Sequence, residues 1–211
     1  MKIGIDIDNV ISNFNDTIVE AYLQHDKQLR NTGIINDKAK VFRRGMFDWS
    51  EEEEKDFYYS NIEKWANDFK PIKDAEYYIK KLKQDGNEIY IISGRENGEY
   101  RNPYKLTEEW LEKYDIIYDK IILTNAYNKH EKAEICLKNN IDIMIEDSIE
   151  TCINLINDGI ETYTMNTRFN QNDLPLNRVS TWKEIYYKIS SKYPKQEEQK
   201  INVILDTDTY N

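Results

Sequence analysis

Five short apolar runs, separated by segments with helical periodicity, constrain the fold of this chain most strongly. The runs lie at residues 3–7, 88–94, 120–124, 141–147 and 161–165. Between them, apolar residues recur at helical spacing, as in segment 72–82, which ends before Gly86. Strands that alternate with helices are typical of a parallel sheet with helices on both faces. We therefore predict an α/β fold built on a parallel sheet.

The remaining helical patterns lie in the second half of the chain. Thr107 is expected to cap a helix that carries Trp110 and Tyr114. Further helices are predicted around residues 133–137, 152–156 and 182–189, the second of these ended by Gly159.

Residues 14–70 interrupt this alternation. They contain no convincing strand but many aromatic residues, and the acidic run 51–54 follows Ser50 as in a capped helix start. We interpret the segment as a small helical insertion after the first strand, with the acidic run on a solvated helix face. Most of its rings are expected to form the core of the insertion, while a few would stack on the planar ring of a ligand.

Polar side chains follow three of the predicted strands. They are Asp6 and Asp8 after the first strand, Ser93 after the second, and Glu146 and Asp147 after the fourth. Because the carboxyl ends of parallel strands meet at one edge of a sheet, these groups should converge. Lys129 and Lys132 precede the fourth strand near a helix start. Lys132 is favoured over Lys129 as the lysine of the site because it opens the helical pattern K-A-E-I-C.

Such a set of groups suits magnesium-assisted phosphoryl transfer. Carboxylate oxygens are ligands that Mg²⁺ prefers. One aspartate can attack phosphorus, and a second can give a proton to the leaving oxygen and later take one from water. A serine hydroxyl and a lysine ammonium can hold the phosphate oxygens.

Composition limits the partners. The chain has 211 residues, of which 39 are acidic and 29 basic, and its formal charge is −10. This charge disfavours long nucleic acid but allows a small phosphorylated substrate beside a metal ion. Two cysteines are too few for a disulfide framework, no apolar run approaches membrane-spanning length, and no signal-peptide pattern opens the chain. We expect a cytoplasmic protein without a membrane partner; a homodimer is compatible with the sequence, which does not fix the oligomeric state.

The motifs resemble those of the haloacid dehalogenase-like (HAD) phosphatases, from residue 1 to about residue 165. Residues 6–10, D-I-D-N-V, match the motif D-x-D-x-[TV]. Ser93, Lys132 and the pair Glu146–Asp147 are similar to the second, third and fourth motifs of the superfamily. The resemblance implies a Rossmann-like core of residues 1–13 and 71–193, with a small helical cap at 14–70 and a linker and tail at 194–211.

The resemblance also implies roles for individual residues. Asp6 would be the nucleophile and Asp8 the general acid and base. Mg²⁺ would lie on Asp6, the backbone carbonyl of Asp8 and Asp147, with Glu146 acting through water. The residues expected to bind substrate are Ser93, Gly94, Arg95, Lys132 and Phe14.

Within the superfamily, the chain most resembles the 5′(3′)-deoxyribonucleotidases. These carry a helical cap directly after the first motif, and an aromatic residue that faces the base eight positions after the nucleophile, here Phe14. Phe42, Phe47 and Trp49 are further candidates for a base pocket. The chain departs from the family pattern at three residues: Asn9 stands in place of the common glycine, Glu146 stands in place of aspartate, and Arg95 follows the second motif closely. The prediction is a Mg²⁺-dependent phosphatase of nucleoside monophosphates.

Two alternatives stay open. One is a HAD phosphatase for another phosphorylated metabolite or a polynucleotide 3′-phosphate, although the acidic charge disfavours a polynucleotide. The other is a non-catalytic module with the same fold, against which the intact set Asp6, Asp8, Lys132 and Asp147 argues.

The tail has its own pattern. After the polar stretch 194–200, residues 201–211 read I-N-V-I-L-D-T-D-T-Y-N and resemble the opening of the nucleoside hydrolases. The further aspartates that complete the calcium site of those enzymes are missing, so no calcium site is expected. An edge strand or a disordered tail is the alternative. The resemblance suggests a chain cut from a fused nucleotidase and nucleoside hydrolase, and removal of residues 195–211 should leave activity nearly unchanged.

Overall fold

A six-stranded parallel sheet with the order β3-β2-β1-β4-β5-β6 forms the centre of the protein. We describe it from a computed structural model, which covers residues 1–36, 45–96 and 98–194. The strands are β1 (Lys2–Ile5), β2 (Glu88–Ser93), β3 (Lys120–Leu123), β4 (Ile143–Glu146), β5 (Glu161–Met165) and β6 (Arg178–Val179). Phe42 and the tail at 195–211 lie outside the described residues.

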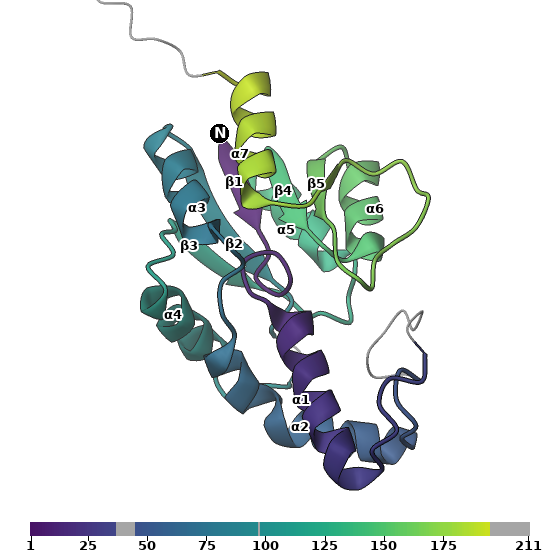
Figure 1. Cartoon of the computed structure of the whole chain (residues 1–211). Helices are drawn as coiled ribbons and strands as arrows, with labels where there is room; N and C mark the ends of the chain where they lie inside the picture. Colours follow the sequence, from purple (N-terminus) through teal and green to yellow (C-terminus); the bar gives the residue numbers. More distant parts are fainter. Residues whose placement is uncertain (37–44, 97, 195–211) are drawn as a thin grey trace, which may run out of the picture.

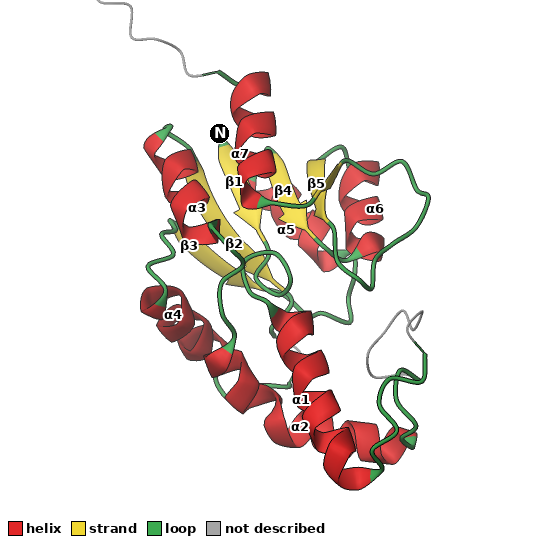
Figure 2. Ribbon diagram, in the orientation of Figure 1, coloured by secondary structure: helices red, strands yellow, loops and turns green. Residues whose placement is uncertain are grey.

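Helices cover both faces of the sheet (Figures 1 and 2). On one face α3 (Ala75–Gln84) packs against α7 (Trp182–Lys192), and on the other α5 (Glu131–Asn139) packs against α6 (Ile149–Asn157). Helix α4 (Pro103–Lys113) packs against β3. This arrangement confirms the predicted Rossmann-like α/β fold. Among the described helices, none combines the length and apolar character needed to cross a membrane.

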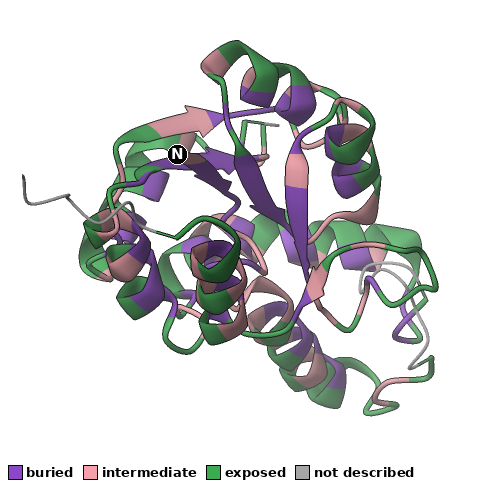
Figure 3. Ribbon diagram, turned by 90° about the horizontal axis from the view of Figure 1, so that it is seen from above, coloured by how far each residue is buried: buried purple, intermediate pink, exposed green. Residues whose placement is uncertain are grey.

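The first strand lies at the centre of the sheet and is buried on both faces. Ile3, Ile5 and Ile7 are completely inaccessible to solvent, and Figure 3 shows the central strands as buried. Full burial of one such side chain contributes about 1.5–3 kcal/mol. A Cβ at Gly4 would lie 2.6 Å from the sulfur of Met144 on the neighbouring strand, so any larger residue there would require Met144 to shift. Close packing therefore fixes the position of β1, from which the D-x-D motif continues.

Two local predictions differ from the structure. Helix α4 begins at Pro103 and is capped by Asn102, whose side chain accepts a hydrogen bond from the Lys105 backbone N–H at 3.3 Å. Thr107 was expected as the cap but is buried inside the helix. An Asn-Pro pair supplies both a cap and a preferred first residue, and so starts the helix at Pro103, more than one turn before the expected start. Strand β6 was not predicted, because two residues are too few for a periodic pattern.

The insertion after β1 is helical, as predicted. Its helices α1 (Phe14–Leu29) and α2 (Glu51–Asp68) extend beyond the carboxyl ends of the strands (Figure 1). Ser50 caps α2 in a capping box with Glu53. Glu54, expected on the solvated face, is instead 3% exposed, because the helix turns it toward the interior of the cap.

An aromatic cluster forms the core of the cap. Tyr22 stacks on Trp49 with 4.8 Å between ring centroids and lies 5.6 Å from the ring of Phe47. Phe57 and Trp65 complete the cluster. Phe47 and Trp49 are both buried in this cluster, which is where most of the cap aromatics were expected.

The two chain segments that enter and leave the cap are hydrogen-bonded to each other. The backbone N–H of Asn13 donates to the carbonyl of Lys70 at 2.9 Å, and the Lys70 N–H donates to the side chain of Asn13 at 2.7 Å. Ile72 N–H donates to the Ile11 carbonyl at 2.6 Å. From α7, Trp182 Nε1 donates to the Val10 carbonyl at 2.8 Å, which anchors the same turn to the core.

Candidate active site

A cavity of about 150 Å³ opens at the carboxyl ends of the strands. Seven of the predicted site residues line it together: Asp6, Asp8, Ser93, Gly94, Lys132, Glu146 and Asp147. The convergence follows from the topology, because β1, β2 and β4 are adjacent and parallel. Two other predicted site residues, Arg95 and Phe14, do not line this cavity.

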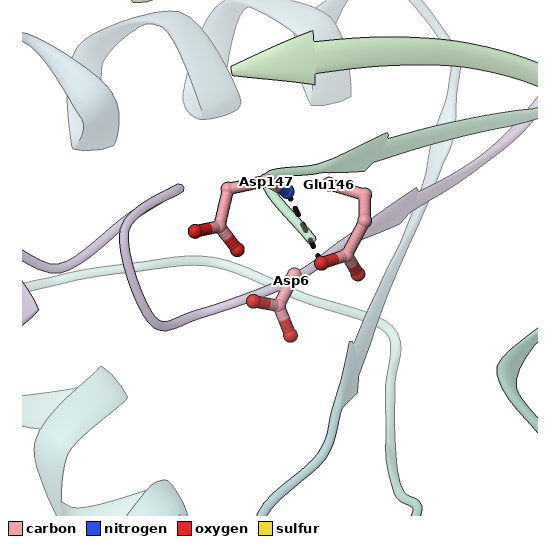
Figure 4. Close-up of side chains that lie close together, drawn as sticks. All are labelled: Asp6, Glu146 and Asp147. Carbon is pink, nitrogen blue, oxygen red and sulfur yellow. Dashed lines mark hydrogen bonds between the residues drawn. The ribbon is translucent and has the colours of Figure 1, made fainter. Parts of the chain in front are cut away.

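Three carboxylates form a compact cluster in the cavity. Asp6 follows β1, while Glu146 and Asp147 lie at the end of β4; each offers one oxygen, and these atoms all lie within 4.8 Å of one another. Figure 4 shows the three side chains lying close together. Hard divalent cations such as Mg²⁺ take oxygen ligands of this kind. The donor set therefore fits a magnesium ion.

Lys132 joins two members of this cluster. Its Nζ donates to Asp6 Oδ1 at 2.9 Å and makes a second, short contact with Glu146 Oε2. Burial opposes the charged form of this lysine, but the charges of Asp6 and Glu146 outweigh burial and raise the pKa of Lys132. The ammonium therefore stays protonated. Lys129, the other lysine considered from the sequence, lines the same cavity from the loop before α5.

The surroundings of Asp6 disfavour its ionised form. Burial raises the pKa of Asp6 to about 7, with added repulsion from Glu146 and Asp8, while Lys132 acts in the opposite direction. Burial, Glu146 and Asp6 also raise the pKa of Asp147. A bound cation would relieve this repulsion and favour the ionised carboxylates.

Glu146 is fixed separately from Asp147. Besides the contact with Lys132, its Oε1 accepts hydrogen bonds from the backbone N–H groups of Asp147 at 3.1 Å and Ser148 at 2.9 Å. The first of these is the dashed line in Figure 4. Glu146 is 1% exposed. Its oxygens are therefore engaged within the protein, which is consistent with an indirect role beside a metal ion.

The two predicted residues outside the cavity have other partners. Arg95 forms an ion pair with Asp8. Phe14 is the first residue of α1, and its ring lies 5.2 Å from that of Phe69. Arg95 therefore contacts the D-x-D motif through Asp8, and Phe14 lies at the base of the cap.

Sequence reasoning missed two parts of the site. The loop after β3 lines the cavity with Thr124, Asn125 and Asn128. The signal was available, because T-N follows a buried strand whose end reaches the same edge of the sheet. The second part is the side chain of Asn9, which was noted only as a departure from a common glycine and also lines the cavity.

Comparison with known proteins identifies the family. Residues 1–193 match the model of the family described as "5' nucleotidase, deoxy (Pyrimidine), cytosolic type C protein". The chain belongs to this family. It is accordingly a phosphatase of the nucleotidase type, and its fold is the HAD-like fold, as the motifs predicted.

Individual relatives agree with this assignment. The chain is 27% identical over 187 residues to "Putative nucleotidase YqfW" of Bacillus subtilis (strain 168), which spans 87% of this chain and 91% of that protein. Two solved structures share the fold. The haloacid dehalogenase-like family protein SP0104 from Streptococcus pneumoniae has a TM-score of 0.63 at 14% identity, covering 89% of this chain and 97% of that one. A HAD family hydrolase from Deinococcus radiodurans R1, with bound phosphate and sodium, has a TM-score of 0.64 at 12% identity, covering 90% and 95%.

Proposed function

We propose that the protein is a Mg²⁺-dependent phosphatase of nucleoside monophosphates, with deoxyribonucleotides as the preferred class, that acts through an aspartyl-phosphate on Asp6. The observation that carries the proposal is the position of Asp6. It lies at the end of the central strand, beside Lys132 and within the carboxylate cluster, in a cavity whose size suits a phosphoryl group.

Charge balance supports a divalent cation. Of the four carboxylates Asp6, Asp8, Glu146 and Asp147, the first three contact a cationic side chain directly: Lys132 binds Asp6 and Glu146, and Arg95 binds Asp8. The four acids thus share two bound cations. Two negative charges are left over, which is the charge that one Mg²⁺ ion neutralises. Asp6, Asp147 and the backbone carbonyl of Asp8 would hold it, with Glu146 acting through water. When bound, Mg²⁺ would supply positive charge to the phosphate oxygens.

The residues can be assigned to two steps. In the first, an Asp6 oxygen attacks phosphorus, the bond from phosphorus to the nucleoside oxygen breaks, and Asp8 gives that oxygen a proton. In the second, Asp8 takes a proton from water, the water oxygen attacks phosphorus, and the bond to Asp6 breaks. Inorganic phosphate leaves and both aspartates are restored. Lys132, Ser93 and the Gly94 backbone would hold the non-bridging oxygens.

The lining of the cavity supports a substrate that extends beyond it. Among the described residues, no aromatic side chain lines the cavity, so it would hold the phosphoryl group, with the nucleoside directed toward the cap. Phe14, at the start of the first cap helix, is our candidate for stacking on the base. The name of the family, which specifies deoxy and pyrimidine, supports a deoxyribonucleotide.

A substrate panel tests the proposal. Phosphate release would be measured from ribo- and deoxyribonucleoside monophosphates, with both 5′ and 3′ phosphates, from sugar phosphates and from an oligonucleotide 3′-phosphate. Each assay would be run with Mg²⁺ and with EDTA. We expect hydrolysis of nucleoside monophosphates with Mg²⁺ and almost none with EDTA.

Controls separate this outcome from the alternatives. Asp6→Asn should be inactive on every substrate while it keeps the thermal midpoint of a folded protein. A preference for sugar phosphates or for the oligonucleotide would overturn the substrate class. Activity that survives EDTA would overturn the metal dependence, and inactivity on the whole panel would overturn the proposal altogether.

A further inference from the structure

Asn9 occupies a tight turn that does not by itself require an asparagine. Its φ of 65° lies in the left-handed region, where glycine is the least strained residue and asparagine the next. Its backbone N–H donates to the Ser12 carbonyl at 3.0 Å. Glycine would satisfy both the dihedral angle and this hydrogen bond, so the presence of asparagine points to its side chain.

The side-chain amide of Asn9 connects two other parts of the protein. Its Nδ2 donates to Asp147 Oδ2 at 3.0 Å, and its Oδ1 accepts from the backbone N–H of Asn15 at 2.8 Å. The orientation of the amide follows from its partners, because a carboxylate can only accept and a backbone N–H can only donate. One amide thus links the end of β4 with the first turn of the cap helix α1.

Asp147 is held by a different partner from the two other acids of the cluster. Asp6 and Glu146 are both bound by Lys132, and Glu146 has two backbone donors in addition. In the part of the chain that the structure describes, Asn9 is the side chain that donates a hydrogen bond to the Asp147 carboxylate. The bond is made to Oδ2 of Asp147 and restrains the orientation of this carboxylate next to the carboxylates of Asp6 and Glu146.

We propose that Asn9 is a positioning residue that orients Asp147 for binding the divalent cation and couples this orientation to the first turn of α1. The inference rests on the proposed function, because it assumes that a cation binds Asp6 and Asp147. It concerns how the protein prepares the site. Partners that orient a metal ligand typically change metal affinity about 10–100-fold when they are removed.

The test uses Asn9→Gly, which keeps the left-handed backbone and deletes both side-chain bonds. Asn140→Gly is the matched control, because Asn140 also has a left-handed φ, 54°, but lies at the far end of α5. Mg²⁺ binding would be measured by titration calorimetry on metal-free protein, together with the thermal midpoint without and with Mg²⁺. We expect the Mg²⁺ Kd of Asn9→Gly to rise at least about tenfold, and that of Asn140→Gly to stay within about twofold of the wild type.

A purely structural role for Asn9 would give another pattern. The midpoint of the metal-free variant would fall, because α1 loses the acceptor for Asn15, while the Kd for Mg²⁺ would not change; that result would overturn the inference. Our inference instead expects phosphatase activity to recover toward the wild-type value at saturating Mg²⁺. Activity that stays low at saturation would mean that Asn9 acts on another step, and would also overturn it.

Failure of the inference can be distinguished from failure of the proposed function. Wild-type protein that binds no Mg²⁺, or an Asp147→Asn variant that binds it as well as the wild type, would remove the metal site and the inference with it. Wild-type binding that is lost in Asp147→Asn but unchanged in Asn9→Gly would remove the inference alone.

Discussion

The guanidinium of Arg95 binds the carboxylate of Asp8 at two points. Nε donates to Oδ2 at 3.0 Å and Nη2 donates to Oδ1 at 2.6 Å. Burial opposes the charge on Arg95, but the charge of Asp8 and its hydrogen bonds outweigh this and raise the pKa of the guanidinium. Ser12 Oγ adds a third hydrogen bond to Oδ1 at 3.2 Å. Two-point pairs of this kind fix orientation as well as charge, so Arg95 sets the direction of the proposed acid and base.

Substitution of Arg95 should affect substrates according to their leaving groups. Arg95→Lys keeps the charge but cannot make the two-point contact. We expect it to slow release of a nucleoside about tenfold or more, within the range of about 10²–10⁴ that general acid catalysis supplies. p-Nitrophenolate leaves without a proton, so the burst of p-nitrophenol from p-nitrophenyl phosphate should change little. An equal loss in the first step for both substrates would show that Arg95 contacts the phosphate instead.

Substitution of the two aspartates of the D-x-D motif should reduce turnover to different extents. Asp6→Asn removes the attacking oxygen and a proposed metal ligand, and we expect turnover to fall by several orders of magnitude. Asp8→Asn should lose about 10²–10⁴-fold through proton transfer. It should still bind Mg²⁺ in calorimetry, because the backbone carbonyl is unchanged. Near-normal turnover of Asp6→Asn would exclude an aspartyl-phosphate on this residue.

The convergence of the site was predictable, but its internal contacts were not. Asp6, Ser93 and Asp147 lie at the carboxyl ends of predicted strands, the alternation of strands and helices indicates that these strands are parallel, and parallel strands bring their ends together. The sequence does not say which carboxylate faces which cation. That depends on how far each side chain reaches across neighbouring loops, as Arg95 does to Asp8 over 87 positions.

The roles of the individual aromatic residues in the cap could not be predicted from the sequence either. An aromatic residue that packs inside a cap and one that faces a ligand have the same pattern. Phe47 and Trp49 lie inside the cluster, while Phe14 is half-buried against Phe69 at the base of the cap. Helix caps were predicted with mixed success. Ser50 was predicted correctly as the cap of α2. The prediction of Thr107 as the cap of α4 was wrong, because Asn102 and Pro103 supply a stronger helix start.

Substitution of Phe14 should separate nucleotides from other phosphates. Phe14→Ala removes the ring, and loss of base stacking would weaken nucleotide binding by roughly 1–3 kcal/mol. Phe14→Leu keeps much of the apolar packing against Phe69 and serves as the control for the fold. KM for nucleoside monophosphates should rise in both variants, while kinetics with p-nitrophenyl phosphate should change little. An equal loss on all substrates would assign Phe14 to the support of the cap.

Removal of Lys132 should destabilise the metal-free protein. Lys132→Met leaves Asp6 and Glu146 buried without their shared cation, and breaking such a buried pair costs about 3–5 kcal/mol. The measurement is urea unfolding in EDTA, with Lys129→Met as the control. Mg²⁺ should restore part of the lost free energy of unfolding. A Lys132→Met midpoint equal to that of the wild type would contradict the paired arrangement.

The cap should be sensitive to acid through Asp26. This residue is 1% exposed and accepts hydrogen bonds from Trp49 Nε1 at 2.9 Å and the Gly33 N–H at 2.6 Å. Burial alone would raise the pKa of Asp26, but the hydrogen bonds from Trp49, Gly33 and Thr32 lower it. A lowered pKa stabilises the fold above the unfolded value of about 4, and this contribution is lost as pH falls through the folded-state pKa.

The corresponding experiment follows the thermal midpoint from about pH 7 to about pH 3, the range that spans the usual aspartate pKa. Asp26→Asn should have a lower midpoint than the wild type at neutral pH and a smaller decrease in acid. Asp56→Asn, on the exposed face of α2, should follow the wild type. Parallel curves for wild type and Asp26→Asn would show that Asp26 does not carry the acid sensitivity.

The hydrogen bonds between segments 11–13 and 70–72 have an evolutionary consequence. The chain leaves the core and returns to it at adjacent positions. For the connectivity of the sheet, the whole cap is therefore equivalent to a single loop. The entropy of closing a loop grows only slowly with its length. Recombination that keeps the first turn of α1, which binds Asn9, could exchange the rest of the cap for a shorter or longer one without moving Asp6 or Asp147. The catalytic residues of the core and the substrate range set by the cap can then evolve separately, so that a new substrate does not require a new catalytic site.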